Sequence, residues 1–170
     1  MKENKIIKYL NSLYVKETGS FLFSKYSNDT ILSTDFTVML CNLLKIDVDS
    51  YYNSEKIKDY LLQTMNVDGL FIDRKFDSSI ERYHKNDYIQ LQFTYFTLIA
   101  LDILGVRFQE LTFMKPFLKE ESLEEWFQQL NWGNFWYESN KIMFIMYFLA
   151  YLMKYGDNEL QTKANEMIQV

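Results

Sequence analysis

Three copies of a glycine-x-phenylalanine pattern constrain the fold of this chain more than any other feature. They occur at Gly19-Ser20-Phe21, Gly69-Leu70-Phe71 and Gly133-Asn134-Phe135, each after a helical stretch and before a very apolar one. A unit that recurs at this spacing is typical of repeat proteins, in which neighbouring units bury one another's apolar faces. The sequence therefore predicts an all-α fold of stacked antiparallel helical hairpins.

The chain of 170 residues has the length of one domain. We expect a single helical domain over residues 1–170, with repeats at about 1–50, 51–110 and 111–170. One proline and five glycines leave long helices possible almost throughout. The apolar runs at 36–44, 93–104 and 142–153 are expected to form an inner layer, and the polar-faced helices an outer one.

Start and stop signals give the expected helix boundaries. The first helix is expected over residues 5–17, and the second over 34–45 with Ser33 as its N-cap. Asn53 or Ser54 caps the next helix, and Gly105 ends the apolar run that begins at Tyr88. A buried helix over 140–155 and a last helix over 159–168 complete the prediction. The side chains expected to face inward from the second helix are Phe36, Leu40, Leu43 and Leu44.

The segment from Gln63 to Phe71, with Asp68-Gly69 inside it, precedes a Thr-containing apolar run that ends at Gly105. In this pattern the chain resembles the α/α-toroid proteins, the prenyltransferase and terpene-cyclase-like group. The resemblance implies inner and outer helices arranged around an axis. A closed toroid needs about six hairpins, and this length supplies about three, so an open, half-toroid-like stack is expected. The family's metal ligands and aspartate-rich catalytic runs have no counterpart in this sequence.

Charge and cysteine content narrow the function classes. The net charge is -5, and an acidic chain is poorly suited to nucleic acid, whose phosphates require a basic surface. Cys41 is the single cysteine, so a disulfide framework is excluded. The apolar run at 142–153 is too short to cross a bilayer, and no apolar signal core follows Met1. We expect a cytoplasmic protein that uses no cofactor, no metal and no membrane.

Groups able to carry catalysis are few. His84 is the only histidine and lies in a polar stretch, apart from Cys41. Acidic residues near the second glycine turn could serve a toroid glycosidase or lyase, but their spacing equally suits a solvated loop. The Asp47-x-Asp49 pair is more typical of a helix N-terminus than of a metal site. We therefore assign no catalytic residues, and the enzyme question stays open.

Partner binding is the alternative that the charge pattern favours. Four glutamates lie within six positions of one helix start, more than a helix N-terminus requires. Aromatic side chains gather at the third glycine turn, and aromatics beside acids are typical of interface hot spots. The expected partner-binding residues are Glu120, Glu121, Glu124, Glu125, Trp132, Trp136, Tyr137, Asp68 and Asp73.

Three hypotheses follow for function. The first is a non-catalytic inhibitor, a bacterial toxin-immunity protein that occludes the active site of a basic, nuclease-type toxin with carboxylates and aromatics. The second is an α/α-toroid-like enzyme or enzyme fragment acting on a glycan or an apolar substrate. The third is a helical-repeat scaffold that self-associates as a homodimer. The acidic composition favours the first.

Overall fold

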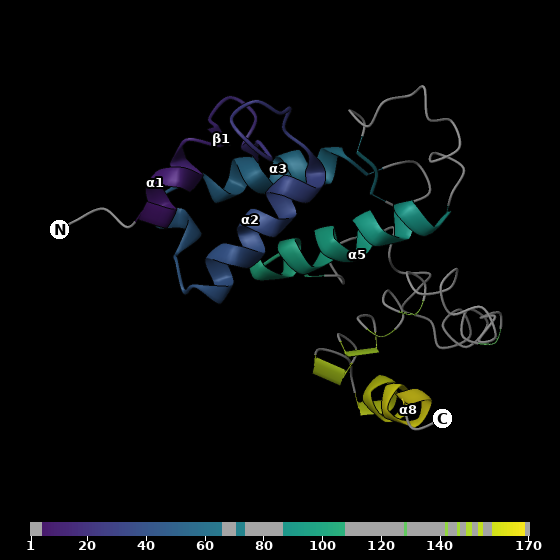
Figure 1. Ribbon diagram of the computed structural model, residues 1–170. Coiled ribbons are helices and arrows are strands. Elements are labelled where there is room, and N and C mark those ends of the chain that lie inside the picture. The colour runs from purple at the N-terminus through teal and green to yellow at the C-terminus, as the bar shows by residue number, and fades with distance from the viewer. Residues whose placement is uncertain are drawn as a thin grey trace.

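The computed structural model describes residues 5–65, 71–73, 87–107, 128, 142, 146, 149–150, 153–154 and 158–168. These residues are mostly helical (Figure 1). The helices are α1 (Lys5–Asn11), α2 (Ile31–Leu43), α3 (Ser54–Gln63), α5 (Asp87–Ile103) and α8 (Asn158–Ile168), with a 3-10 turn η1 (Val48–Ser50). Two short strands, β1 (Tyr14–Val15) and β2 (Ser20–Phe21), form an antiparallel sheet, which corrects the all-α expectation.

The first glycine turn shortens the first helix relative to its prediction. Helix α1 ends at Asn11, and the chain then reverses so that Tyr14 pairs with Phe21. Gly19 has φ +81°, and a β-carbon at this position would lie 2.5 Å from the backbone carbonyl of Lys56. Only glycine combines this backbone conformation with so close an approach to α3. The residues expected to extend the first helix therefore form a hairpin packed on α3.

Helix α2 begins three residues earlier than Ser33 and Thr34 would suggest. Thr30 is its N-cap, and Ser33 occupies the third helical position in a reciprocal capping box. The Thr30 hydroxyl accepts from the Ser33 N–H, while the Ser33 hydroxyl accepts from the Thr30 N–H. The serine was thus correctly placed at the start of the helix, but its role within the cap was wrong.

Later boundaries agree more closely with the sequence. Asn53 caps α3 by accepting from the N–H of Lys56, and Ile57 and Leu61 are buried on that helix. Asp47 caps η1, which confirms the helix-N-terminus interpretation of the Asp47-x-Asp49 pair. Gly105, with φ +85°, follows the end of α5, and α8 coincides with the predicted last helix within one residue.

Helices α2 and α5 lie side by side and run in the same direction, with α3 packed against both (Figure 1). The Thr97 hydroxyl of α5 donates to a carboxylate oxygen of Asp35 on α2 across 2.9 Å. The Phe36 and Phe96 rings, next to these two residues in the chain, meet edge to face with centroids 5.0 Å apart. Seven residues after Asp35 and Thr97, Asn42 and Leu104 line one hollow, so the contacts advance together along both helices, as a parallel pair requires.

Two of the three glycine-x-phenylalanine copies make the same hydrogen bond. The N–H of Phe21 donates to the Thr34 hydroxyl across 3.0 Å, and the N–H of Phe71 donates to the Thr94 hydroxyl across 2.9 Å. Both phenylalanines are fully buried. In each case the backbone of the turn phenylalanine is hydrogen-bonded to a threonine of the following apolar helix. The third copy, at residues 133–135, lies outside the described residues.

The apolar helices of these copies match from the hydrogen-bonded threonine to their end. The two threonines are 60 residues apart, and the same spacing relates Lys45 to Gly105, which both have positive φ. After them, Ile46 donates to the Cys41 carbonyl at 2.8 Å and Val106 donates to the Leu101 carbonyl at 2.9 Å. We call residues 5–46 the first unit and 54–106 the second. A stack of three hairpins and a half-toroid shape remain predictions.

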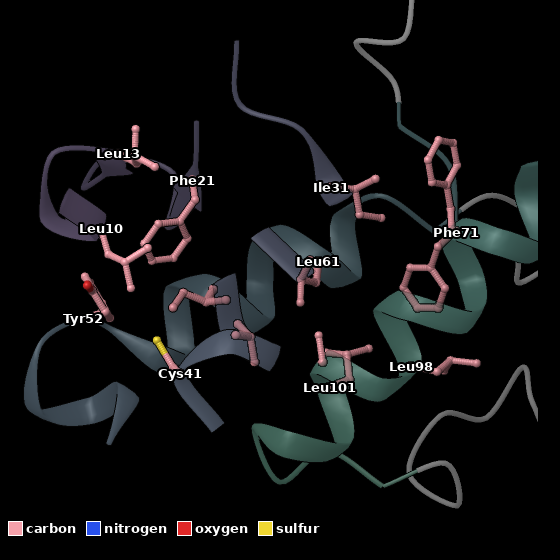
Figure 2. Packing of buried hydrophobic residues seen from close by; sticks show 14 of the residues in the cluster. Leu10, Leu13, Phe21, Ile31, Cys41, Tyr52, Leu61, Phe71, Leu98 and Leu101 are labelled. Atoms are coloured by element: carbon pink, nitrogen blue, oxygen red, sulfur yellow. The ribbon is translucent and has the colours of Figure 1, made fainter. Parts of the chain in front are cut away.

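The apolar core runs through both units (Figure 2). In the first unit, Phe21 packs edge-on against Tyr52, with ring centroids 5.1 Å apart, beside Leu10. In the second unit, Phe71 and Leu98 of α5 are both buried in the same cluster. The core also includes Cys41 of α2, and it extends to Leu149 and Ala164 in the C-terminal part of the chain. Of the described helices, none has the length and apolar character needed to cross a bilayer.

Candidate functional site

Most of the predicted partner-binding residues cannot be placed. Glu120, Glu121, Glu124, Glu125, Trp132, Trp136, Tyr137 and Asp68 lie outside the described residues, as does His84. Asp73 is described, and its side chain is only 4% exposed. The backbone N–H of Ile31, the first residue of α2, donates to Asp73 across 3.0 Å. A carboxylate at a helix N-terminus stabilises the unpaired amides there, so Asp73 joins the two units rather than offering a surface to a partner.

A second carboxylate is buried more deeply between α2 and α5. Asp35 is fully buried, with one oxygen bonded to Thr97 and the other without a hydrogen-bond partner. Burial raises the pKa of Asp35 well above 3.8; the Thr97 hydroxyl opposes this shift and the charge of Asp73 adds to it. Burial also raises the pKa of Tyr60, and the charges of Asp29, Asp73 and Asp35 add to that shift. Full burial keeps Asp35 from any substrate in this conformation.

No group of three metal-ligating side chains occurs within the described parts of the chain. The described residues also line a larger and a smaller hollow. One, of about 820 Å³, is a wide groove lined by residues that include Tyr14, Tyr51, Lys16 and Lys56. The other, of about 230 Å³, lies between the C-terminal ends of α2 and α5.

The described residues expose one apolar surface that the sequence analysis had placed in the core. Phe36, Leu40, Leu43 and Leu44 are 41%, 37%, 77% and 40% exposed. We call these four residues the α2 apolar surface. They were predicted to face inward, and that prediction is wrong. The buried side of α2 instead carries Ser33, Thr34, Asp35 and Thr37 together with Ile31, Val38 and Cys41.

Specific hydrogen bonds explain this reversal. Apolar residues occur on both sides of α2, so apolar periodicity alone does not select the side that is buried. Thr34 accepts from the first glycine turn, Asp35 binds α5, and Ser33 donates to the Phe21 carbonyl. Their side chains must face the neighbouring backbone, because unpaired polar groups are costly to bury. The leucines on the opposite side are left in solvent.

Acidic side chains lie at the C-terminal end of the α2 apolar surface. Asp47 and Asp49 are exposed and line the smaller hollow, whose apolar side is formed by residues that include Ile103 and Leu104. Asp47 also caps η1, accepting from the Asp49 N–H and the Ser50 hydroxyl. The helix thus presents apolar side chains along its length and carboxylates at its end. Such a surface suits a partner that combines apolar and basic side chains.

A signal for this surface was present in the sequence. Thr30, Ser33, Thr34 and Thr37 recur at helical spacing on one side of α2, and a polar stripe of this kind beside an aspartate indicates hydrogen bonds to neighbouring elements. Aligning α2 with α5 at a spacing of 60 residues would have strengthened that interpretation.

No family model, no curated protein and no solved structure matches this chain.

Proposed function

We propose that this chain acts without catalysis, by binding another protein through the α2 apolar surface. The observation that carries the proposal is the exposure of Phe36, Leu40, Leu43 and Leu44 along one helix. Soluble proteins rarely leave a contiguous row of large apolar side chains in water unless a partner covers it. Burying one leucine side chain contributes about 1.5–3 kcal/mol, so a few such residues can anchor an interface.

Charge indicates the kind of partner. The chain carries a net charge of -5, and Asp47 and Asp49 lie at the end of the apolar row. These carboxylates favour a protein with basic side chains around an apolar contact, and they speed its association. An inhibitor of a basic toxin, such as a bacterial immunity protein, fits these requirements. It needs shape and charge complementarity and no reacting group.

Co-expression tests the inhibitor role. The C-terminal region of the protein encoded immediately upstream would be produced in bacteria with and without this chain. We expect growth arrest without the chain, and restored growth with co-purification of both proteins when it is present. A harmless upstream product that forms no complex would contradict the inhibitor role.

Point variants then test the surface. Leu43→Ser removes the most exposed leucine of α2 and should weaken the complex at least roughly tenfold, since each factor of ten corresponds to about 1.4 kcal/mol. Tyr26→Ser is the matched control, because Tyr26 is almost completely exposed but lies in a loop before α2. Equal affinity of both variants and the unmodified chain would show that the partner binds elsewhere, with Glu120, Glu121, Glu124 and Glu125 as the next candidates.

A further inference from the structure

The contact between α2 and α5 uses a different side of each helix. On α2 it involves Asp35, which bonds to Thr97, and Asn42, which lines the same hollow as Leu104. On α5 it involves Thr97 and Leu104, with Ala100 between them on the same stripe. We call the Asp35–Asn42 side the donor stripe and the Thr97–Ala100–Leu104 side the acceptor stripe. These names refer to the docking of one helix onto the next and not to the hydrogen bond, in which the Thr97 hydroxyl donates to Asp35.

The spacing of 60 residues shows where α2 carries its own acceptor stripe. The positions equivalent to Thr97, Ala100 and Leu104 are Thr37, Leu40 and Leu44. Ala100 is completely buried, whereas Leu40 is more than one-third exposed, as is Leu44. Two of the three positions of the acceptor stripe of α2, Leu40 and Leu44, are therefore partly uncovered, whereas Thr37 is buried. In the equivalent stripe of α5, Thr97 and Ala100 are completely buried and Leu104 is partly buried.

The C-terminal part of the chain exposes a donor stripe, whereas α2 exposes part of its acceptor stripe. Residues 142, 146, 149–150 and 153–154 are helical, and the Lys154 ammonium lies 3.8 Å from the Asp102 carboxylate of α5. The glycines that follow these apolar runs, Gly105 and Gly156, are 51 residues apart, and this spacing relates Leu149 to Leu98, which are both buried.

The same spacing relates Met146 and Met153 to Tyr95 and Asp102, the donor stripe of α5. Met146 is 47% exposed and Met153 is 43% exposed. The helix row consists of α2, α5 and the helical residues that include Met146 and Met153, and the stripes exposed at its two described ends are of different types. One exposes an acceptor stripe of leucines, and the other exposes a donor stripe of methionines.

We propose that a second copy of this chain docks head to tail, with Met146 and Met153 of one copy against Leu40 and Leu44 of the next. The chain already forms a contact of this type once, where α2 packs on α5. A second copy supplies the same donor side, and methionine adapts readily to an irregular apolar surface. A contact that joins two different surfaces closes into a ring if the rotation allows, and otherwise extends into a filament. This assembly does not require the inhibitor role, but both contacts use Leu40 and Leu44, so a second copy and a partner would compete for α2.

Sedimentation of the purified chain over a range of concentrations tests the assembly. We expect a concentration-dependent dimer or larger species for the unmodified chain. Leu40→Lys combined with Leu44→Lys should abolish it, as should Met146→Lys combined with Met153→Lys. A monomer at all concentrations up to roughly 100 μM would overturn the proposal, because the dissociation constant would then be too weak for a specific assembly.

Mixing the two double variants is the decisive step. Each retains one intact stripe, so a head-to-tail contact predicts that the two monomeric variants form a one-to-one heterodimer and nothing larger. A symmetric contact through α2 alone predicts instead that the methionine variant still dimerises and that mixing restores nothing. Either of these results would contradict the proposal.

Tyr26→Lys is the control, because Tyr26 is almost completely exposed in the loop before α2 and outside both stripes; this variant should assemble like the unmodified chain. Circular dichroism verifies that each variant is folded. If the leucine double variant unfolds, Leu44→Gln at the C-cap of α2 tests the same stripe with a smaller change, and it should raise the dissociation constant at least roughly tenfold. Loss of partner rescue in Leu43→Ser with unchanged assembly would separate the two proposals.

Discussion

Helices α2 and α5 accept the same hydrogen bond from the preceding glycine turn and end in the same way, yet they differ in how much apolar surface they leave in water. Both receive a phenylalanine N–H on a threonine, and both are followed by a residue with positive φ. Position 40 is a partly exposed leucine, whereas position 100 is a buried alanine. The small side chain occurs where the neighbouring helix covers the stripe. The large one occurs where, among the described residues, nothing does.

The comparison shows that a helix's place in the row decides which of its sides becomes core. The shared hydrogen bonds fix the rotation of each helix about its axis. The neighbours then determine whether the remaining apolar side is covered. Substitutions at matched positions can separate these two effects.

The largest effect is expected at the turn that precedes α2. Gly19→Ala should destabilise the protein by about 3 kcal/mol or more, because the added carbon would overlap the Lys56 backbone in a strained conformation. Denaturant unfolding measures the loss. Gly105→Ala is the control: it has a similar φ but open space around it, so it should cost about 1 kcal/mol. Equal losses would show that backbone conformation, not the approach to α3, requires glycine at position 19.

The shared hydrogen bond gives the next effect. Thr34→Val and Thr94→Val each leave a buried phenylalanine N–H without its acceptor and should each cost about 1–3 kcal/mol. Thr162→Val is the control, since its hydroxyl makes only an exposed bond within α8; its effect should stay within about 0.5 kcal/mol. Denaturant unfolding of all three variants measures these losses of stability and shows whether those at Thr34 and Thr94 are similar. A large loss at one threonine and none at the other would break the equivalence of the units.

The buried carboxyl of Asp35, absent at the equivalent Tyr95, should give a pH-dependent effect. The pKa of Asp35 is raised in the folded state, so the folded protein retains a proton that the unfolded chain loses above pH 3.8. Stability therefore falls as the pH rises from 3.8 to the folded pKa, and is constant above it. Asp35→Asn should remove this slope and gain about 1 kcal/mol at pH 7 relative to the unmodified chain.

Unfolding at pH 4 and pH 7 measures the slope, with the exposed Asp59→Asn on α3 as its control. Asp73 is the other acid whose charge acts on Asp35, so its carboxylate is kept in both variants. A uniform loss of stability in Asp35→Asn at both pH values would mean that the carboxylate is stabilised by the site.

The smallest effect is expected at the end of α2. Lys45 has φ 55°, a conformation that glycine adopts without cost and that its counterpart Gly105 also uses. Lys45→Gly should therefore stabilise the protein by about 0.5–1 kcal/mol, visible as a rise in the thermal midpoint. A fall in the midpoint would indicate that the lysine side chain makes a contact worth more than the strain.

The sequence predicted the bounds and caps of the helices better than it predicted which side of a helix is buried. The helix at Asn53, the stop at Gly105, the capping role of Asp47 and the last helix follow from local capping and turn chemistry, which single residues control. The buried side of α2 depends on hydrogen bonds to residues 13 and 62 positions away, which no local window contains. The early end of the first helix at Asn11 likewise depends on a contact between Gly19 and α3. Of the predicted site residues only Asp73 could be placed, so the acidic and aromatic surface stays a prediction.

The position of Cys41 gives this protein a natural reporter of its own opening. The thiol is the only one in the chain, lies on the covered side of α2, and has its pKa raised by burial. An alkylating reagent can reach it only when α2 separates from its neighbours, so the labelling rate measures how often the first unit opens. The same measurement on a Cys41→Ala variant with Leu101, its counterpart in α5, replaced by cysteine would time the second unit separately. A difference between the two rates would give the order in which the helix row comes apart.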